Sequence, residues 1–71
     1  MDVKERLIAL RRKKPFTPIR ITFSDGRAFE IQDPFLYGLG ETTMIIAFEK
    51  GGREQLSLRD IVSIEELQPT A

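Results

Sequence analysis

Hydrophobic positions along the chain change their spacing at Lys14-Pro15. Before this point, apolar residues recur every three to four positions, as they do on one face of a helix: Val3, Leu7 and Leu10. After it, apolar and polar residues alternate over 19–23 and 29–31, as they do in strands with one buried face. The pattern predicts a helix over residues 2–14 followed by several short strands.

Signals at both ends bound the predicted helix. Asp2 followed three residues later by Glu5 has the spacing of a capping box, which satisfies free N–H groups at a helix start. Pro15 ends the helix, because the residue before a proline is displaced from the helical conformation. Four basic residues fall in the last turn, where the helix dipole favours positive charge: Arg11, Arg12, Lys13 and Lys14.

The loop after the first strand determines how the first two strands pair. A two-residue turn at Asp25-Gly26 would place the apolar residues of the two strands on opposite faces. A three-residue loop over 24–26, with Gly26 in the left-handed conformation, places them on the same face. We therefore expect three cross-strand pairs, two apolar and one charged: Ile21 with Phe29, Ile19 with Ile31, and Arg20 with Glu30.

The rest of the chain predicts one loop and three more strands. Asp33-Pro34 interrupts the second strand, and the apolar segment 35–40 is expected to pack as an irregular loop over the mouth of a barrel. Three strands are expected beyond it, the first of them buried on both faces: residues 42–48, 54–58 and 61–67. Residues 1–71 then form a single domain, mainly β with one N-terminal α-helix. Within it, residues 19–67 form a small five-stranded barrel and residues 68–71 a frayed tail.

Length and composition restrict how such a domain is stabilised. A domain of this size buries only about 60% of its unfolded surface. The chain has no cysteine and no histidine, which excludes disulfides and the usual metal sites. Self-association is therefore an expected source of stability. The longest apolar run, Met44 to Phe48, is far shorter than the roughly 20 residues of a membrane span, and no signal peptide is apparent. We expect a cytoplasmic protein without a membrane partner.

Charge is balanced overall but divided along the chain. Residues 1–20 carry seven basic and two acidic side chains, whereas residues 21–71 carry four basic and nine acidic ones. The net charges of the two segments are therefore +5 and −5. A basic segment of this kind could bind phosphate groups, the acidic part of its own chain or a neighbouring copy.

The side chains needed for catalysis are scarce. No histidine is present to act as an acid or base near neutral pH, and no cysteine is present to act as a nucleophile. Glu65 and Glu66 are adjacent on a predicted strand and point to opposite faces, so they cannot share a site. We therefore expect no enzyme activity, no catalytic residues, no cofactor and no metal.

Three apolar side chains are candidates for contacts with a partner protein. Phe35 and Tyr37 lie in the apolar loop, where they could anchor a protein, stack on a nucleic-acid base, or close a barrel mouth with the phenol in water. Val62 lies in the final strand, DIVSIEEL, which is the expected open edge of the sheet. Unpaired strand edges recruit further strands, so this edge is expected to mediate self-association.

The chain shows two resemblances, the first of which covers most of it. The segments PFTPIRITFSDGRAFEI and LSLRDIVSIEEL, separated by a DP break, resemble a group of small bacterial helix-plus-barrel proteins without an assigned function. LIALRRKKPFTPIRITFSDGRAFEI and SLRDIVSIE also resemble the Sm-like family, in particular its bacterial RNA chaperone. That resemblance implies a bent, five-stranded barrel of the Sm-like or SH3-like type, ring assembly by strand pairing, and binding of single-stranded RNA. The chaperone's Tyr-Lys-His motif falls at Leu58, Arg59 and Asp60, which implies an RNA contact for Arg59.

Two hypotheses of function follow. The first is a small non-enzymatic interaction module that contacts other proteins and associates with itself. The alternative is binding of single-stranded RNA, in which basic residues contact the phosphates: Arg11, Arg12, Lys13, Lys14 and Arg59.

Overall fold

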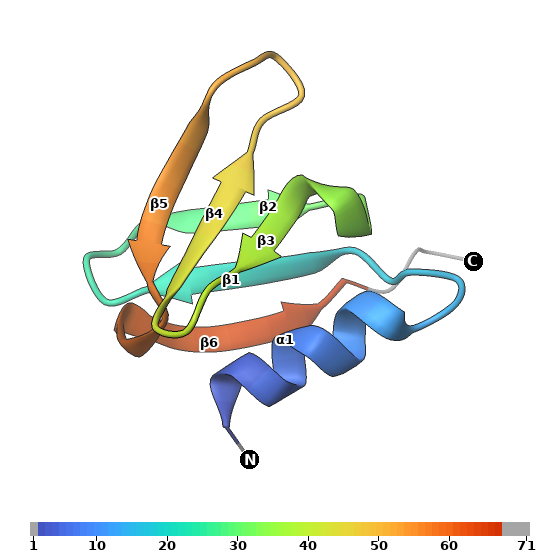
Figure 1. The fold of residues 1–71 in the computed structure, drawn as a ribbon, viewed down its shortest axis with the longest axis horizontal. Coiled ribbons are helices and arrows are strands. Elements are labelled where there is room, and N and C mark those ends of the chain that lie inside the picture. The colour runs from blue at the N-terminus through green and yellow to red at the C-terminus, as the bar shows by residue number, and fades with distance from the viewer. Residues whose placement is uncertain (1, 68–71) are drawn as a thin grey trace.

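The computed structural model describes residues 2–67, which form one helix and six strands (Figure 1). The helix α1 spans Val3–Arg12, and two short 3-10 turns, η1 and η2, span Pro34–Leu36 and Leu58–Asp60. The strands are β1 (Ile19–Phe23), β2 (Ala28–Ile31), β3 (Tyr37–Leu39), β4 (Thr43–Ala47), β5 (Arg53–Ser57) and β6 (Ile61–Glu66). They form two three-stranded antiparallel sheets, with the orders β2-β1-β6 and β3-β4-β5.

The helix has the predicted apolar face and lies within the expected range 2–14. Asp2 caps its start, where a side-chain oxygen accepts a hydrogen bond from the N–H of Lys4 at 3.4 Å. At the other end, the chain leaves the helical conformation at Lys13. The face that packs on the sheets is the predicted one, through Leu7 and Leu10.

The predicted pairing of the first hairpin is confirmed. Gly26 has a φ of 94°, and the N–H of Phe23 donates to the carbonyl of Arg27 at 2.8 Å, which closes a three-residue loop. The three expected cross-strand pairs are present: Ile19 with Ile31, Arg20 with Glu30, and Ile21 with Phe29.

The expected five-stranded barrel over residues 19–67 is wrong, because the strands form two separate sheets and no closed barrel. The segment 35–40, expected as an irregular loop, contains most of η1 and an additional strand, β3, which pairs with β4. Asp33 accepts a hydrogen bond from the N–H of Phe35 at 2.8 Å, while Pro34 has no N–H to offer a neighbouring strand. The predicted break after the second strand is therefore present, and beyond it the chain enters a second sheet. The coarser class, mainly β with one N-terminal helix, is correct.

The later strands lie near their expected ranges but are buried differently. The strand expected over 42–48 was predicted to be buried on both faces, yet only one face of β4 is covered. Met44 and Ile46 are buried, whereas Ile45 points outward and is 40% exposed. The apolar run therefore overstates burial, because within residues 2–67 the face of β4 that carries Ile45 is not covered. The tail predicted at 68–71 lies outside the described residues.

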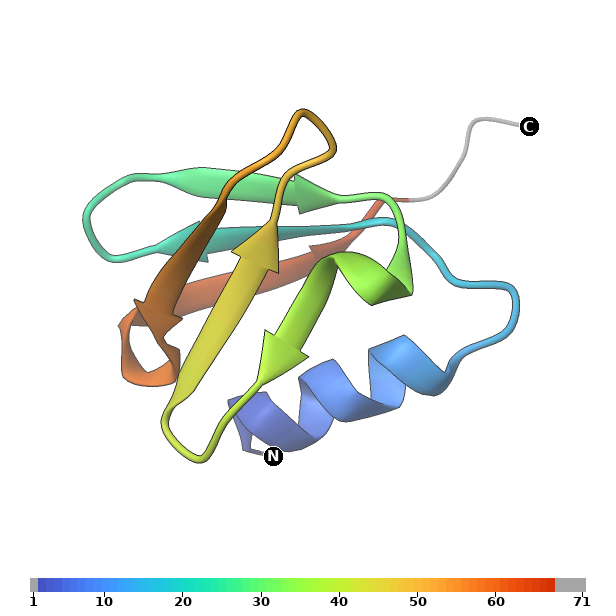
Figure 2. The same cartoon turned by 45° about the horizontal axis from the view of Figure 1, so that its top comes forward.

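The hydrophobic core lies between the two sheets and α1. The helix packs against the side of the molecule where β6 of one sheet and β3 of the other lie (Figures 1 and 2). Two polar contacts hold it there. The Tyr37 hydroxyl donates a hydrogen bond to the carbonyl of Leu7 at 2.7 Å, and the Lys13 ammonium pairs with the Glu66 carboxylate at 2.7 Å. One side of the two-sheet core is therefore covered by the helix.

Substitution of Gly26 by alanine should destabilise the fold by about 1 to 2 kcal/mol, because a Cβ is strained at its positive φ. Gly38 is the matched control. It lies in β3, has no positive φ, and has open space where a Cβ would be added. Gly38→Ala should therefore be neutral or slightly stabilising. Urea unfolding of both variants measures the difference, and equal losses of stability would show that the turn conformation is not the cause.

Candidate protein-interaction site

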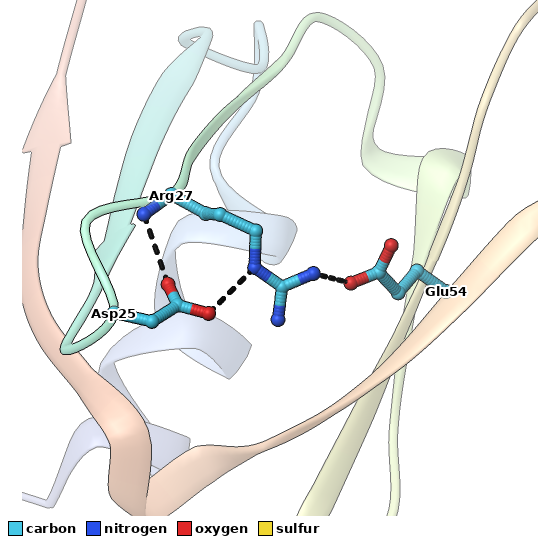
Figure 3. Close-up of polar contacts among 3 residues, drawn as sticks. All are labelled: Asp25, Arg27 and Glu54. Atoms are coloured by element: carbon cyan, nitrogen blue, oxygen red, sulfur yellow. Dashed lines mark hydrogen bonds and ion pairs between the residues drawn. The ribbon is translucent and has the colours of Figure 1, made fainter.

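The side of the core at the β2 edge is covered by side chains instead of a helix. Arg27 lies in the loop before β2, between Asp25 and Glu54 of β5 (Figure 3). Asp25 accepts hydrogen bonds from both the backbone N–H and the Nε of Arg27, at 2.9 and 2.7 Å, and these bonds lower the pKa of that carboxyl. Because Arg27 also pairs with Glu54, it links the first hairpin to the second sheet.

Aromatic side chains continue this link. The rings of Phe23 and Phe29 meet edge to face at 5.7 Å between centroids, and the Phe29 ring lies 6.2 Å from that of Phe48. The guanidinium of Arg27 lies over Phe29 at 5.8 Å. Phe48 is 39% exposed, so the aromatic chain extends from the core to the surface.

Beside these aromatic rings lies a groove of about 680 Å³, which we call the β2 groove. Residues 28–32 line it from one sheet and residues 46–51 from the other, and Leu36 of η1 also contributes to the lining. Five consecutive residues of the β2 segment line the groove, although neighbouring side chains of a strand point to opposite faces. The groove therefore runs along the backbone edge of β2, and it includes apolar side chains of both sheets.

This edge of β2 has unpaired main-chain groups. Within residues 2–67, β2 pairs with β1 on one side and with no strand on the other. In an antiparallel pair, every second residue directs its N–H and C=O groups toward the neighbouring strand. Arg27 bonds to Phe23 in this way, so Phe29 and Ile31 also direct their main-chain groups toward β1. Ala28 and Glu30 then present their N–H and C=O groups outward. A strand edge and an apolar groove thus lie side by side.

The structure separates the two aromatic residues that the sequence placed together as partner contacts. Phe35, in η1, is 85% exposed and does not line the β2 groove, although the next residue, Leu36, does. Tyr37 is only 2% exposed. The expectation that its phenol stays in water is wrong, because the hydroxyl bonds to α1 and the guanidinium of Arg11 lies 5.5 Å from its ring. Tyr37 is therefore out of reach of a partner in this conformation, whereas Phe35 is accessible.

The third predicted contact residue lies on a different edge. As predicted, the final strand β6 is at the edge of its sheet, and Val62 is 66% exposed. The pairing of β6 with β1 is irregular near Val62, where the register shifts between Thr22 and Phe23. Because β1 lies between β2 and β6, the two edges are separate surfaces.

The basic residues predicted for RNA binding do not form one surface. Arg11 covers Tyr37, and Lys13 pairs with Glu66, whose pKa is lowered by this hydrogen bond and by the nearby positive charge. Arg59 lies in η2 and lines a hollow with Asp2 at the other end of α1. Ten helical residues span about 15 Å, so the helix separates Arg59 from the basic cluster at the C-terminal end of α1.

The residues that make the β2 groove were not singled out by sequence reasoning. Phe29 was assigned to the core, and no local signal marks Phe48 or the outward groups of Ala28 and Glu30 as a site. Their exposure depends on how the two sheets meet, which is set by contacts between distant residues. Within the described residues, no three histidine, cysteine or acidic side chains cluster as metal ligands would, and no helix is long and apolar enough to span a membrane.

Comparisons with protein-family models, with curated proteins and with solved structures found no match. The site is therefore interpreted from its own geometry.

Replacing Tyr37 with phenylalanine should lower the free energy of unfolding by about 1 kcal/mol near neutral pH, because it removes the buried bond to Leu7. Burial raises the pKa of the phenol above its ordinary value of 10.0, and the charge of Arg11 partly opposes this. Ionisation of the phenol therefore favours the unfolded chain. The difference in the free energy of unfolding between the native protein and Tyr37→Phe should shrink as the pH rises above about 10. Urea unfolding of both proteins between pH 7 and about 11 measures the gap. A gap that is constant with pH would contradict the assigned burial.

Proposed function

We propose that this protein is a non-enzymatic interaction module that binds an extended segment of a partner protein along β2. The observation that carries the proposal is the unpaired edge of β2 directly beside the apolar β2 groove. The cytoplasmic location expected from the sequence belongs to the same proposal.

The binding mode follows from strand geometry. An extended segment laid along β2 forms main-chain hydrogen bonds with the outward groups of Ala28 and Glu30. Its side chains alternate, so every second one enters the groove and contacts residues such as Phe29 and Phe48. Phe35 does not line the groove, but its exposed ring, next to Leu36 in the chain, offers a separate candidate contact. Main-chain bonds supply affinity in this arrangement, and the groove supplies selectivity.

Replacing Ala28 with proline should abolish binding at this edge without unfolding the protein. Proline removes the outward N–H and places its ring where the added strand would lie. The ladder to β1 keeps its bonds, because Ala28 and Thr22 form a pair that does not exchange hydrogen bonds. The probe is a phage-displayed library of random heptapeptides, panned on the native protein, followed by affinity measurements on the enriched peptides. We expect at least a tenfold loss of affinity for Ala28→Pro.

Ala28→Thr is the matched control, since it keeps the N–H and a residue suited to strands. Circular dichroism verifies that both variants fold. The proposal is contradicted if panning enriches no peptide, or if the enriched peptides bind the folded proline variant as tightly as the native protein.

Self-association through β6 is a second candidate function. It is favoured by the position of β6 at a sheet edge and by the 66% exposure of Val62 there. Six residues make β6 the longest strand among the described residues, so it offers the longest edge for pairing with a second copy.

Val62→Pro should lower the oligomer mass, because proline at this edge removes an N–H donor and obstructs a neighbouring strand. Sedimentation at micromolar to millimolar protein concentration gives the mass, with Val62→Thr as the control that keeps the donor. A native protein that is monomeric throughout this range, or a folded Val62→Pro protein of unchanged mass, would exclude this interface.

Binding of single-stranded RNA has less support from the geometry. Arg11 and Lys13 already contact Tyr37 and Glu66, and Arg59 lies at the opposite end of the helix. A phosphate backbone bound at the C-terminal end of α1 would therefore meet chiefly Arg12 and Lys14.

A further inference from the structure

The outer face of the first sheet carries a row of charges that ends at the β2 edge. Glu30, Arg20 and Glu65 lie opposite one another on β2, β1 and β6. The Arg20 guanidinium pairs with the Glu30 carboxylate at 2.7 Å. The hydrogen bond and charge of Glu30, and more weakly the charge of Glu65, raise the pKa of Arg20. One cation therefore serves two carboxylates, and this cross-strand row keeps a net charge of −1.

If a further strand pairs with the free edge of β2, its residue that directly faces Glu30 extends this row of charges. Opposite charges on directly facing residues of neighbouring strands stabilise the pairing, and like charges oppose it. A lysine or arginine facing Glu30 would neutralise the row, whereas an acidic residue there would add a third carboxylate to it. The charge on the edge therefore discriminates between partners.

The neighbours of that basic residue must differ from it in character. Side chains alternate along a strand, so a residue that faces Glu30 on the outer face is flanked by two that face the inner side. On that side lies the β2 groove, where Phe29, Ile46 and Phe48 offer apolar contacts. Apolar side chains are the ones that gain by burial there.

We propose that the β2 groove selects extended segments in which a basic residue stands between two apolar residues. This inference rests on the proposed function, and it adds the chemistry of the partner. The occupant is a single extended segment of another protein. It needs no second layer of its own, because residues 46–51 already line the groove on the inner side.

The protein already pairs β2 with a segment of this pattern on its other side. In β1, Arg20 stands between Ile19 and Ile21, and these three residues face Glu30, Ile31 and Phe29. A peptide with the sequence of residues 17–23, TPIRITF, is therefore a suitable probe. The same peptide with glutamate or glutamine in place of its arginine tests the charge alone.

The experiment measures fluorescence polarisation of the three labelled peptides with the intact protein at low ionic strength. We expect the arginine peptide to bind at least tenfold more tightly than the glutamate peptide, with the glutamine peptide between them. The difference in affinity between the peptides should shrink as salt is added, because the Glu30 carboxylate is exposed to solvent and its charge is screened. In the Glu30→Lys protein the order of the arginine and glutamate peptides should reverse, and in Glu30→Gln the preference should largely disappear.

The outcomes separate the inference from the proposed function. Equal binding of the three peptides, lost in Ala28→Pro, would overturn the charge preference and leave binding along β2 intact. Failure of all three peptides while panned peptides of another pattern bind would likewise overturn the inference alone. Binding that Ala28→Pro does not weaken would overturn both. The inference is supported if the folded Glu30→Lys protein prefers the glutamate peptide. If that variant does not fold, loss of the preference for the arginine peptide in Glu30→Gln supports it instead.

Discussion

The interruption of strand pairing after Ile31 is the constraint on which the rest of the structure depends. Pro34 begins the 3-10 turn η1, and the Asp33 side chain accepts a hydrogen bond from the N–H of Phe35, so the chain leaves the extended conformation here and the β1–β2 ladder ends. The chain therefore starts a second sheet at Tyr37. Because β2 ends one sheet and β3 ends the other, both strands keep a free edge.

The two sides of the core are covered by different means, and the proposed binding site lies on the side without the helix. On the side of β6 and β3, α1 contributes buried leucines, and the hydroxyl of Tyr37 bonds to its backbone. At the β2 edge, the contact of the Phe29 and Phe48 rings and the ion pair of Arg27 with Glu54 link the two sheets. Exposed ion pairs contribute at most about 1 kcal/mol each. The proposed added strand would therefore pack on the side of the core that α1 does not cover.

Local pattern was sufficient to predict some elements, whereas others depend on distant contacts. The helix and the first hairpin follow from spacing, capping and a glycine turn within 30 residues, and the pairing of Ile21 with Phe29 was correct. The separation into two sheets was not predictable in the same way. Tyr37–Leu39 is a three-residue strand within an apolar run that shows no alternation of apolar and polar residues. It is a strand because it pairs with β4, and the Tyr37 hydroxyl fixes its position by bonding to the carbonyl of Leu7. The candidate site was missed for the same reason, since an edge is free only relative to the whole sheet.

The charge on the β2 edge would also oppose pairing of two copies of the protein along this strand. An unpaired strand beside an apolar groove is a hazard, because identical edges can join. Two copies that paired along β2 would each bring a cross-strand row with a net negative charge, and these rows would repel one another. Glu30 would therefore act in two ways, opposing a second copy and favouring a basic partner, which is how specific interfaces combine attraction with rejection. The proposed pairing of a second copy along β6 would use a different edge, because β1 separates β6 from β2.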